Sequence, residues 1–561
     1  MKRWITALLN VAVFIATLIL VYDISPKHLS RKIEKKEHGT DNAMAALDFW
    51  TRARAYPDKD IPPDKYYQAY VAAKANAKKL PRSAYSIEAD TTWQPIGPLN
   101  SYNHGRSISV AVDPTNSDIV YCGTASGGLW VSHTAGLGSD WARITLGYPA
   151  LGISAIMIDP TDHNTIYLGT GEVYRYQTAV TGLVLRTTRG SYGVGILKTT
   201  DGGGTWTKSL DWTYNQERGI QQIKINPLNH KTLFTATTEG VYRSNDAGVT
   251  WTQVLSVLMA TDILINANDT TQLLAACGNF NSTDYGLYRS INTGSSWSRI
   301  SGSVSEYSGK TLLDAYPSNN NIVWASVADS TTGAGSLWNS TDFGGTWSSM
   351  QSYPPDQNGF FGVQGWYSHF VAIKSNDPST IVHGGLYVIR SANGGVGFGG
   401  TSGGYSDNHN FARDPLNPNV LYIVNDNGIF RSTDFGINFT DVSGGMQTLQ
   451  FYNGFSCSAT DSTIAIGQSQ DHIPGFLFQG TINWGRPSGT DEVGWTAIDQ
   501  TNDNIMYAIN RYGGSFYKSV NRGSSFSSPA SFIQGAWNSP LVVSPINSNI
   551  IYAGTVNVYK S

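Results

Sequence analysis

Two sets of polar and aromatic residues have the types needed to act on a sugar chain. Carboxylates in pairs cleave glycosidic bonds, and aromatic rings with hydrogen-bonding groups hold sugars. The predicted catalytic residues are Glu172, Asp407 and Asp471. The predicted ligand-binding residues are Tyr174, Tyr176, Trp366, Tyr367, His409 and Asp426. The alternative is that these side chains only order long loops, and the sequence leaves both interpretations open.

Two short motifs also contain groups that ligate metals. They are "DNH" (residues 407–409) and "QDH" (residues 470–472). A histidine next to an aspartate is weak evidence without a third, suitably spaced ligand. Whether the protein binds a metal therefore stays open, and no cofactor is predicted.

An eight-residue motif, here called the octet, marks the structural elements that are expected to position these residues. Its copies are "TTDGGGTW" from Thr199, "SNDAGVTW" from Ser244, "SINTGSSW" from Ser290, "STDFGGTW" from Ser340, "SANGGVGF" from Ser391, "STDFGINF" from Ser432 and "SVNRGSSF" from Ser519. The acidic or amide residue can accept hydrogen bonds from the backbone of its own turn, and the glycine two positions later can adopt positive φ. These residues are Asp201, Asp246, Asn292, Asp342, Asn393, Asp434 and Asn521. Because Asn replaces Asp in some copies, the octet is predicted to be a structural turn and not a catalytic site.

Each octet belongs to a repeat of four short, alternating strands, at the period of about 40–50 residues that propeller blades show. The fold is therefore predicted to be an all-β propeller of about ten repeats with a short helical prefix. Seven blades with a partial second propeller, or one ten-bladed ring, would both fit. In a four-stranded meander the octets and first turns share one face, and the long loops lie on the opposite face, where binding groups concentrate.

The octets resemble the Asp-box, or BNR, repeat of sialidases, xyloglucanases and sortilin, all of which are β-propellers. The resemblance covers Trp93 to Ser561. Further patterns, such as "GTASGGLW" and "QSQDH", resemble bacterial proteins called BNR-repeat glycosyl hydrolases. In xyloglucanases a Thr-Asp pair before Gly-Gly supplies a catalytic carboxylate, and here the matching position is Ala125. The Arg-Ile-Pro motif of sialidases does not occur in the sequence.

The N-terminus carries an apolar run from Trp4 to Tyr22 behind Lys2 and Arg3, which is just long enough to span a bilayer. Residues 1–24 are therefore predicted to be a signal anchor that holds the rest outside the cytoplasm, or a signal peptide if the protein is secreted. Residues 25–90 are predicted to be a charged tether and helical prefix. Residues 91–447 then form repeats 1–7, and residues 448–561 form repeats 8–10. The sequence stops where the tenth octet is expected, so this last part is predicted to be truncated or closed by a strand from elsewhere.

The composition of the chain argues against a nucleic-acid partner. The net charge of -3 provides no electrostatic attraction for nucleic acid. The three cysteines, Cys122, Cys277 and Cys457, are predicted to be buried free thiols. The leading hypothesis is a secreted or membrane-anchored propeller that binds an extracellular polysaccharide or protein through its loop-rich face. The alternative is a xyloglucanase-like glycoside hydrolase.

Overall fold

The computed structural model describes most of the chain from His104 onward. The undescribed residues there are 149–150, 179–183, 189–190, 192, 214–217, 281, 308, 330–331, 357–358, 363, 452–453, 473, 488–489, 493 and 536–537. Before His104 it describes 55–57, 65, 68–69, 71–72, 75 and 96–98. The predicted anchor at 1–24 lies outside these residues.

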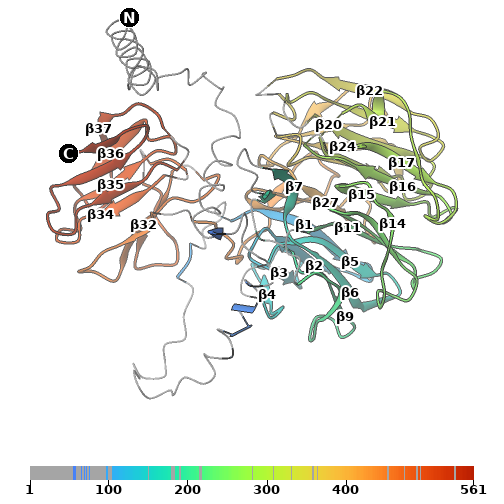
Figure 1. The fold of residues 1–561 in the computed structure, drawn as a ribbon, viewed down its shortest axis with the longest axis horizontal. Coiled ribbons are helices and arrows are strands. Elements are labelled where there is room, and N and C mark those ends of the chain that lie inside the picture. Colours follow the sequence, from blue (N-terminus) through green and yellow to red (C-terminus); the bar gives the residue numbers. More distant parts are fainter. Residues whose placement is uncertain are drawn as a thin grey trace, which may run out of the picture. The chain divides into compact units, whose positions relative to one another are not determined.

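The described chain is almost entirely antiparallel β-sheet, as predicted, and the sheets of residues 107–441 follow one another around a ring (Figure 1). The strands of the first four sheets are β1 (Ser107–Asp113), β2 (Asn116–Thr124), β3 (Leu129–Ser132), β4 (Ala142–Ile144); β5 (Ile153–Asp159), β6 (Asp162–Thr170), β9 (Gly195–Thr199), β10 (Thr207–Asp211); β11 (Ile220–Ile225), β12 (Leu233–Thr237), β13 (Gly240–Ser244), β14 (Thr252–Leu255); β15 (Ala260–Ile265), β16 (Leu273–Cys277), β17 (Gly286–Ser290) and β18 (Ser298–Arg299). The next three are β19 (Thr311–Ala315), β20 (Val323–Ala328), β21 (Gly335–Ser340), β22 (Ser348–Tyr353); β23 (Phe370–Lys374), β24 (Asp377–Gly384), β25 (Val388–Ser391), β26 (Gly399–Gly400); β27 (Asn410–Arg413), β28 (Leu421–Asn425), β29 (Gly428–Ser432) and β30 (Thr440–Asp441).

Seven sheets close this ring. Each first strand contacts the first strand of the next sheet, in the order β1, β5, β11, β15, β19, β23 and β27, and β27 contacts β1. A hairpin of β7 (Val173–Thr178) and β8 (Val184–Thr188) is inserted in the second sheet, and a 3-10 turn (Ser303–Ser305) precedes the fifth. Of the two predicted arrangements, a seven-sheet ring is therefore the one observed.

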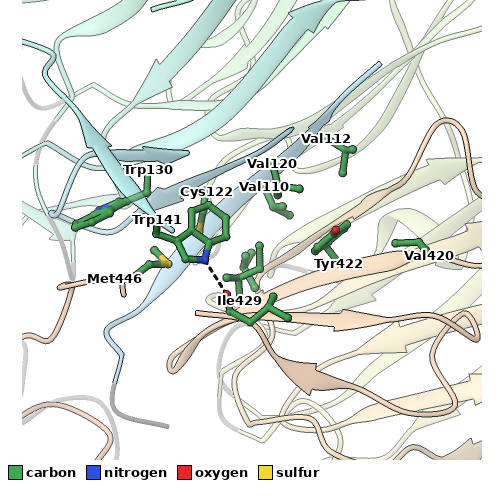
Figure 2. Packing of buried hydrophobic residues seen from close by; sticks show 12 residues of the cluster. Val110, Val112, Val120, Cys122, Trp130, Trp141, Val420, Tyr422, Ile429 and Met446 are labelled. Carbon is green, nitrogen blue, oxygen red and sulfur yellow. Dashed lines mark hydrogen bonds between the residues drawn. The ribbon is translucent and has the colours of Figure 1, made fainter. Parts of the chain in front are cut away.

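Apolar packing between the first and seventh sheets forms the seam of the ring (Figure 2). Cys122 and Trp130 of the first sheet and Tyr422 of the seventh belong to one buried cluster. The Trp141 indole N–H donates to the Val442 carbonyl at 2.7 Å. The first and seventh sheets share no strand. The buried rings and this hydrogen bond join them instead.

Three further sheets follow. Their strands are β31 (Ser456–Cys457), β32 (Ile464–Gly467), β33 (Phe476–Gln479); β34 (Thr496–Ile498), β35 (Met506–Ile509), β36 (Ser515–Ser519), β37 (Ser527–Ser531); β38 (Leu541–Val543), β39 (Ile551–Gly554) and β40 (Val558–Lys560). β31 contacts β34, and β34 contacts β38, so these sheets pack in series. The domain boundaries drawn from the sequence stay predictions.

All seven octets form the same hydrogen-bonded turn between the third and fourth strands. In the copy from Ser340, the hydroxyl donates to Asp342 Oδ1 and accepts from the Gly344 N–H, at 2.8 and 2.7 Å. The Thr346 N–H donates to the same carboxylate oxygen at 2.8 Å. Asn292 accepts the corresponding bonds from Ser290 and Ser296 through its amide oxygen. The octet is therefore a turn whose acceptor can be a carboxylate or an amide.

We expect Asp342→Ala to lower the free energy of unfolding by about 0.5–2 kcal/mol, the range for losing a helix N-cap. Asp342→Asn is expected to cost much less, because Asn292 already fills this role. Denaturant unfolding of both variants checks the prediction. An Asn variant as unstable as the Ala variant would show that the negative charge is needed.

The described residues of the prefix and the three cysteines confirm one prediction and correct another. Ala55, Lys65, Gln68–Ala69, Val71–Ala72 and Ala75 have helical backbone, as expected for the prefix. Cys122 and Cys277 are buried free thiols, but Cys457 is exposed, so its predicted burial was wrong. Cys457 lies in the two-residue strand β31 at the start of the eighth sheet, where little of the chain covers it. Among the described residues, no helix is long and apolar enough to cross a membrane.

Candidate functional site

A cavity of about 270 Å³ lies at the centre of the seven-sheet ring, and all seven first strands or the residues next to them line it. Polar and charged residues contribute much of its wall. They are Ser154, Glu172, Gln221, Gln222, Lys224, Thr261, Asp262, Lys310, Asp314, His409, Asn410 and Arg413. Since the first strands begin near the long loops, three predicted site residues, Glu172, Tyr174 and His409, line this cavity.

Glu172 is held in a buried ion pair. It lies between β6 and β7, directly before Val173, and Arg106 comes just before β1. The Arg106 Nε and Nη2 atoms donate to the two Glu172 oxygens, each at 3.0 Å. The Tyr174 hydroxyl donates to Glu172 Oε1 at 2.7 Å. The carboxylate of Glu172 thus forms a bidentate contact with a guanidinium, which fixes its position.

A second buried group adjoins the first. Asp426, in the turn between β28 and β29, accepts hydrogen bonds from the Tyr367 hydroxyl at 2.8 and 3.0 Å. His409 Nε2 lies 2.6 Å from Asp426 Oδ1. The ring of Tyr174 packs edge-on against Trp366 and Tyr367, with centroids 5.3 and 5.5 Å away. The structure therefore joins six predicted site residues from four loops into one network.

Burial changes the role expected for two of the aromatic residues. Trp366 and Tyr367 are 5% and 0% exposed, so neither presents a ring face to a ligand. Their amphipathic rings instead fill the space between loops, and Asn279 Nδ2 donates to the Trp366 carbonyl at 2.8 Å. The prediction that their rings are open binding platforms does not fit this burial.

Asp407 and Asp471 lie in a different place, beside Tyr405. The Tyr405 hydroxyl donates to the Asp471 carbonyl at 2.7 Å. Burial, followed by the negative charges of Asp471, Asp426 and Asp407, raises the pKa of Tyr405 to about 12, although Arg486 acts in the opposite direction. Asp407 and Asp471 are partly exposed. Asp407 and Asp471 therefore both lie close enough to this phenol to raise its pKa, and they come from loops far apart in the sequence.

The loop that carries Ala125 is linked to the loop that carries Asp471. Gln450 Nε2 donates to the Ser126 hydroxyl at 2.9 Å, and the Gln470 N–H donates to the Gln450 carbonyl at 3.0 Å. Ala125 itself is 1% exposed. The position where the resemblance implies a carboxylate is thus connected to Asp471 through Ser126, Gln450 and Gln470, and it carries only a methyl group.

Two site predictions, Tyr176 and a possible metal, are still to be compared with the structure, and some site residues were not predicted. Tyr176 lies on β7, whose backbone pairs with β8, and its side chain is outside the description. Among the described residues, no group of three His, Cys, Asp or Glu side chains could hold a metal ion. Arg106, Tyr405 and Lys310 were not among the residues predicted for the site. One signal could have pointed to Arg106. A buried carboxylate such as Glu172 needs a basic partner, so an arginine or lysine could have been sought beside it.

Comparison with known proteins gives the following relatives, and no family model matches the chain. The chain is 25% identical to the xyloglucanase Xgh74A of Acetivibrio thermocellus over 376 residues, covering 60% of this chain and 38% of that protein. It is 22% identical to a xyloglucanase of Paenibacillus sp. over 381 residues, covering 63% of this chain and 32% of that protein. The matched part is therefore well under half of either xyloglucanase.

Solved structures show the same fold. An ancestral GH74 enzyme matches with a TM-score of 0.58 and 14% identity, covering 84% of this chain and 69% of that chain. The GH74 xyloglucanase of Xanthomonas campestris matches with a TM-score of 0.50 and 14% identity, covering 82% and 85%. These comparisons support the hydrolase alternative better than the binding-only hypothesis.

Proposed function

We propose that this protein is a glycoside hydrolase that acts on a polysaccharide of the xyloglucan type. The similarity to xyloglucanases in sequence and in fold carries the proposal. In this proposal Asp407 and Asp471 supply the acidic chemistry, since they are partly exposed, lie on separate loops and both act electrostatically on the phenol of Tyr405. Glycosidic cleavage needs two carboxylates, one as an acid and one as a base or nucleophile.

The environment of each carboxylate supports this assignment. Glu172 is 3% exposed and held by Arg106 and Tyr174, so it has no free oxygen edge to offer a glycosidic bond. Asp426 is 2% exposed and bonded to Tyr367 and His409. In this proposal both acidic groups rigidify the loops, and catalysis belongs to Asp407 and Asp471.

A second function is favoured by one observation. Ala125 stands where the resemblance implies a catalytic carboxylate, and binding without cleavage needs no such group. In that case the loop-rich face holds the polysaccharide and releases it intact. The proposed location for either function is outside the cytoplasm, which the apolar run at residues 4–22 supports.

We expect the purified protein to release reducing ends from xyloglucan, and Asp407→Asn or Asp471→Asn to reduce the rate by about 10²–10⁴-fold, because a lost acid or base has no substitute. Asp434→Asn is the matched control. It makes the same chemical change in an octet, where Asn occurs naturally, and should leave the rate unchanged. A polysaccharide panel read for reducing ends and for binding measures both activities.

The remaining results separate the two functions. Saturable binding of a polysaccharide without cleavage would replace the hydrolase proposal with the binding one. Neither binding nor cleavage across xyloglucan and other β-glucans would reject both.

A further inference from the structure

The central cavity is larger than a water site and is not sealed. Its volume of about 270 Å³ corresponds to about nine water molecules at roughly 30 Å³ each. Gln221, Gln222, Lys224 and Arg413 line it, and all four keep part of their surface exposed. A small solute can therefore be accommodated on the axis of the ring.

The three carboxylates of the wall are already engaged. Glu172 pairs with Arg106, and Asp314 pairs with Arg413. Asp262 accepts the N–H groups of Ile263 and Leu313, at 2.8 and 2.9 Å. Through these contacts the three carboxylates link neighbouring strands. Most of their hydrogen-bonding capacity is therefore already used.

Two lysines of the wall are left with little compensation. Lys224 of β11 and Lys310, which precedes β19, both line the cavity, and among the described residues neither forms an ion pair. The Lys310 ammonium has three donors, but its hydrogen bond to the Tyr367 carbonyl is long, at 3.4 Å. Burial lowers the pKa of Lys310 to about 8, although Asp262 and Glu172 act to raise it. Of the three wall carboxylates, only Asp262 is not paired with an arginine. Its single negative charge balances one of the two lysines, so one positive charge is left in the cavity.

The rest of the wall suits a hydroxylated molecule. The neutral polar residues Ser154, Thr261, Gln221 and Asn410 line the cavity together with the aromatic residues Tyr174, Phe370 and Phe411. We propose that the cavity binds a small monocarboxylate that carries hydroxyl groups, of the size of a hexuronate. Lys224 and Lys310 hold its carboxylate, and the neutral polar groups and rings hold its hydroxyl groups and carbon faces. This site is separate from Asp407 and Asp471 and does not depend on the proposed hydrolysis.

Calorimetric titration with sodium glucuronate tests the proposal, with glucose and inorganic phosphate as the other probes. We expect one saturable glucuronate site, at least tenfold weaker binding of glucose, and at least tenfold weaker glucuronate binding in Lys224→Met or Lys310→Met. Lys231→Met is the control, since Lys231 is exposed in the turn between β11 and β12. Lys224 is half-buried, so its variant keeps the test valid if the Lys310 variant does not fold.

Three results would overturn the proposal. They are no saturable glucuronate binding, tighter binding of phosphate than of glucuronate, or unchanged glucuronate binding in a folded Lys224→Met protein. Reducing-end release is measured on the same samples, so failure of this site and failure of the hydrolase proposal are read separately.

Discussion

Lowering the pH from 7 to 5 is expected to reduce the free energy of unfolding by about 4 kcal/mol through His369 and His383 together. Both side chains are 0% exposed. Burial lowers the pKa of His383 to about 3 and the pKa of His369 well below its usual value, with Lys310 and His383 lowering the latter further. The folded protein therefore keeps both rings neutral at pH 5.

A directional chain of hydrogen bonds explains why these rings stay neutral. The Lys310 carbonyl can only accept, so His369 Nε2 donates to it at 3.1 Å. His369 Nδ1 then accepts from the Ser326 hydroxyl at 2.8 Å, and Ser326 accepts from His383 Nε2 at 2.8 Å. His383 Nδ1 accepts from the Tyr353 hydroxyl at 3.0 Å. An added proton on either ring would remove the nitrogen acceptor that a neighbouring hydroxyl uses, and would place a positive charge in a buried site.

The sign of the pH effect follows from this chain. The unfolded chain takes up protons on both histidines below about pH 6.5, and the folded protein does not. Their full contribution is therefore present above pH 6.5 and is lost as the pH falls below it. Asp262, whose pKa burial raises to about 6, changes stability in the opposite direction over the same range. Asp262 is common to wild type and variants, so it cancels in a comparison.

Urea unfolding at pH 7 and pH 5 measures the effect. The difference between the two pH values should be about 2 kcal/mol smaller in His383→Gln than in wild type, because glutamine does not titrate. His133→Gln, a change at an exposed histidine, should leave the difference unaltered. An equal difference in His383→Gln and wild type would mean that the buried chain does not control acid stability.

Glu172→Leu is expected to lower the free energy of unfolding by about 3–5 kcal/mol, because it leaves the guanidinium of Arg106 buried without its bidentate partner. The two side chains are 1% and 2% exposed. Arg106→Met combined with Glu172→Leu should recover most of this loss, since no buried charge remains. The double-mutant comparison separates the cost of an orphaned charge from the value of the pair.

A surface pair provides the control. Arg522 contacts Asp461 with side chains that are 43% and 31% exposed, so Arg522→Met should cost at most about 1 kcal/mol. Denaturant unfolding of the four proteins tests the prediction. If Glu172→Leu were no worse than Arg522→Met, the pair at Glu172 would be accessible to water.

The repeated turns could be predicted because their chemistry is local. The octet's acceptor, hydroxyl and glycine lie within five residues, so their roles follow from the sequence, and the hydrogen bonds of Asp342 and Asn292 agree with them. The choice between seven sheets and ten could not be made from the sequence, since closure depends on packing between Trp141 and Val442, which are 301 residues apart.

The candidate site was predictable in part for a related reason. The rule that long loops share one face brings Glu172, Tyr174 and His409 to one cavity. It does not reveal which side chains neutralise one another, because Arg106 is distant from Glu172 in sequence. Trp366 illustrates the same limit, since its burial depends on the contacts made by neighbouring loops.

The seam between β1 and β27 has a consequence for how the ring assembles during synthesis. Each sheet is built from strands of one continuous stretch, with only the β7–β8 hairpin inserted, so a sheet can form as soon as its stretch has left the ribosome. The joint between the seventh and first sheets is made of side chains and not of an exchanged strand. The first sheet therefore has no need to wait for a strand from the end of the ring, and docking of two finished sheets completes the circle.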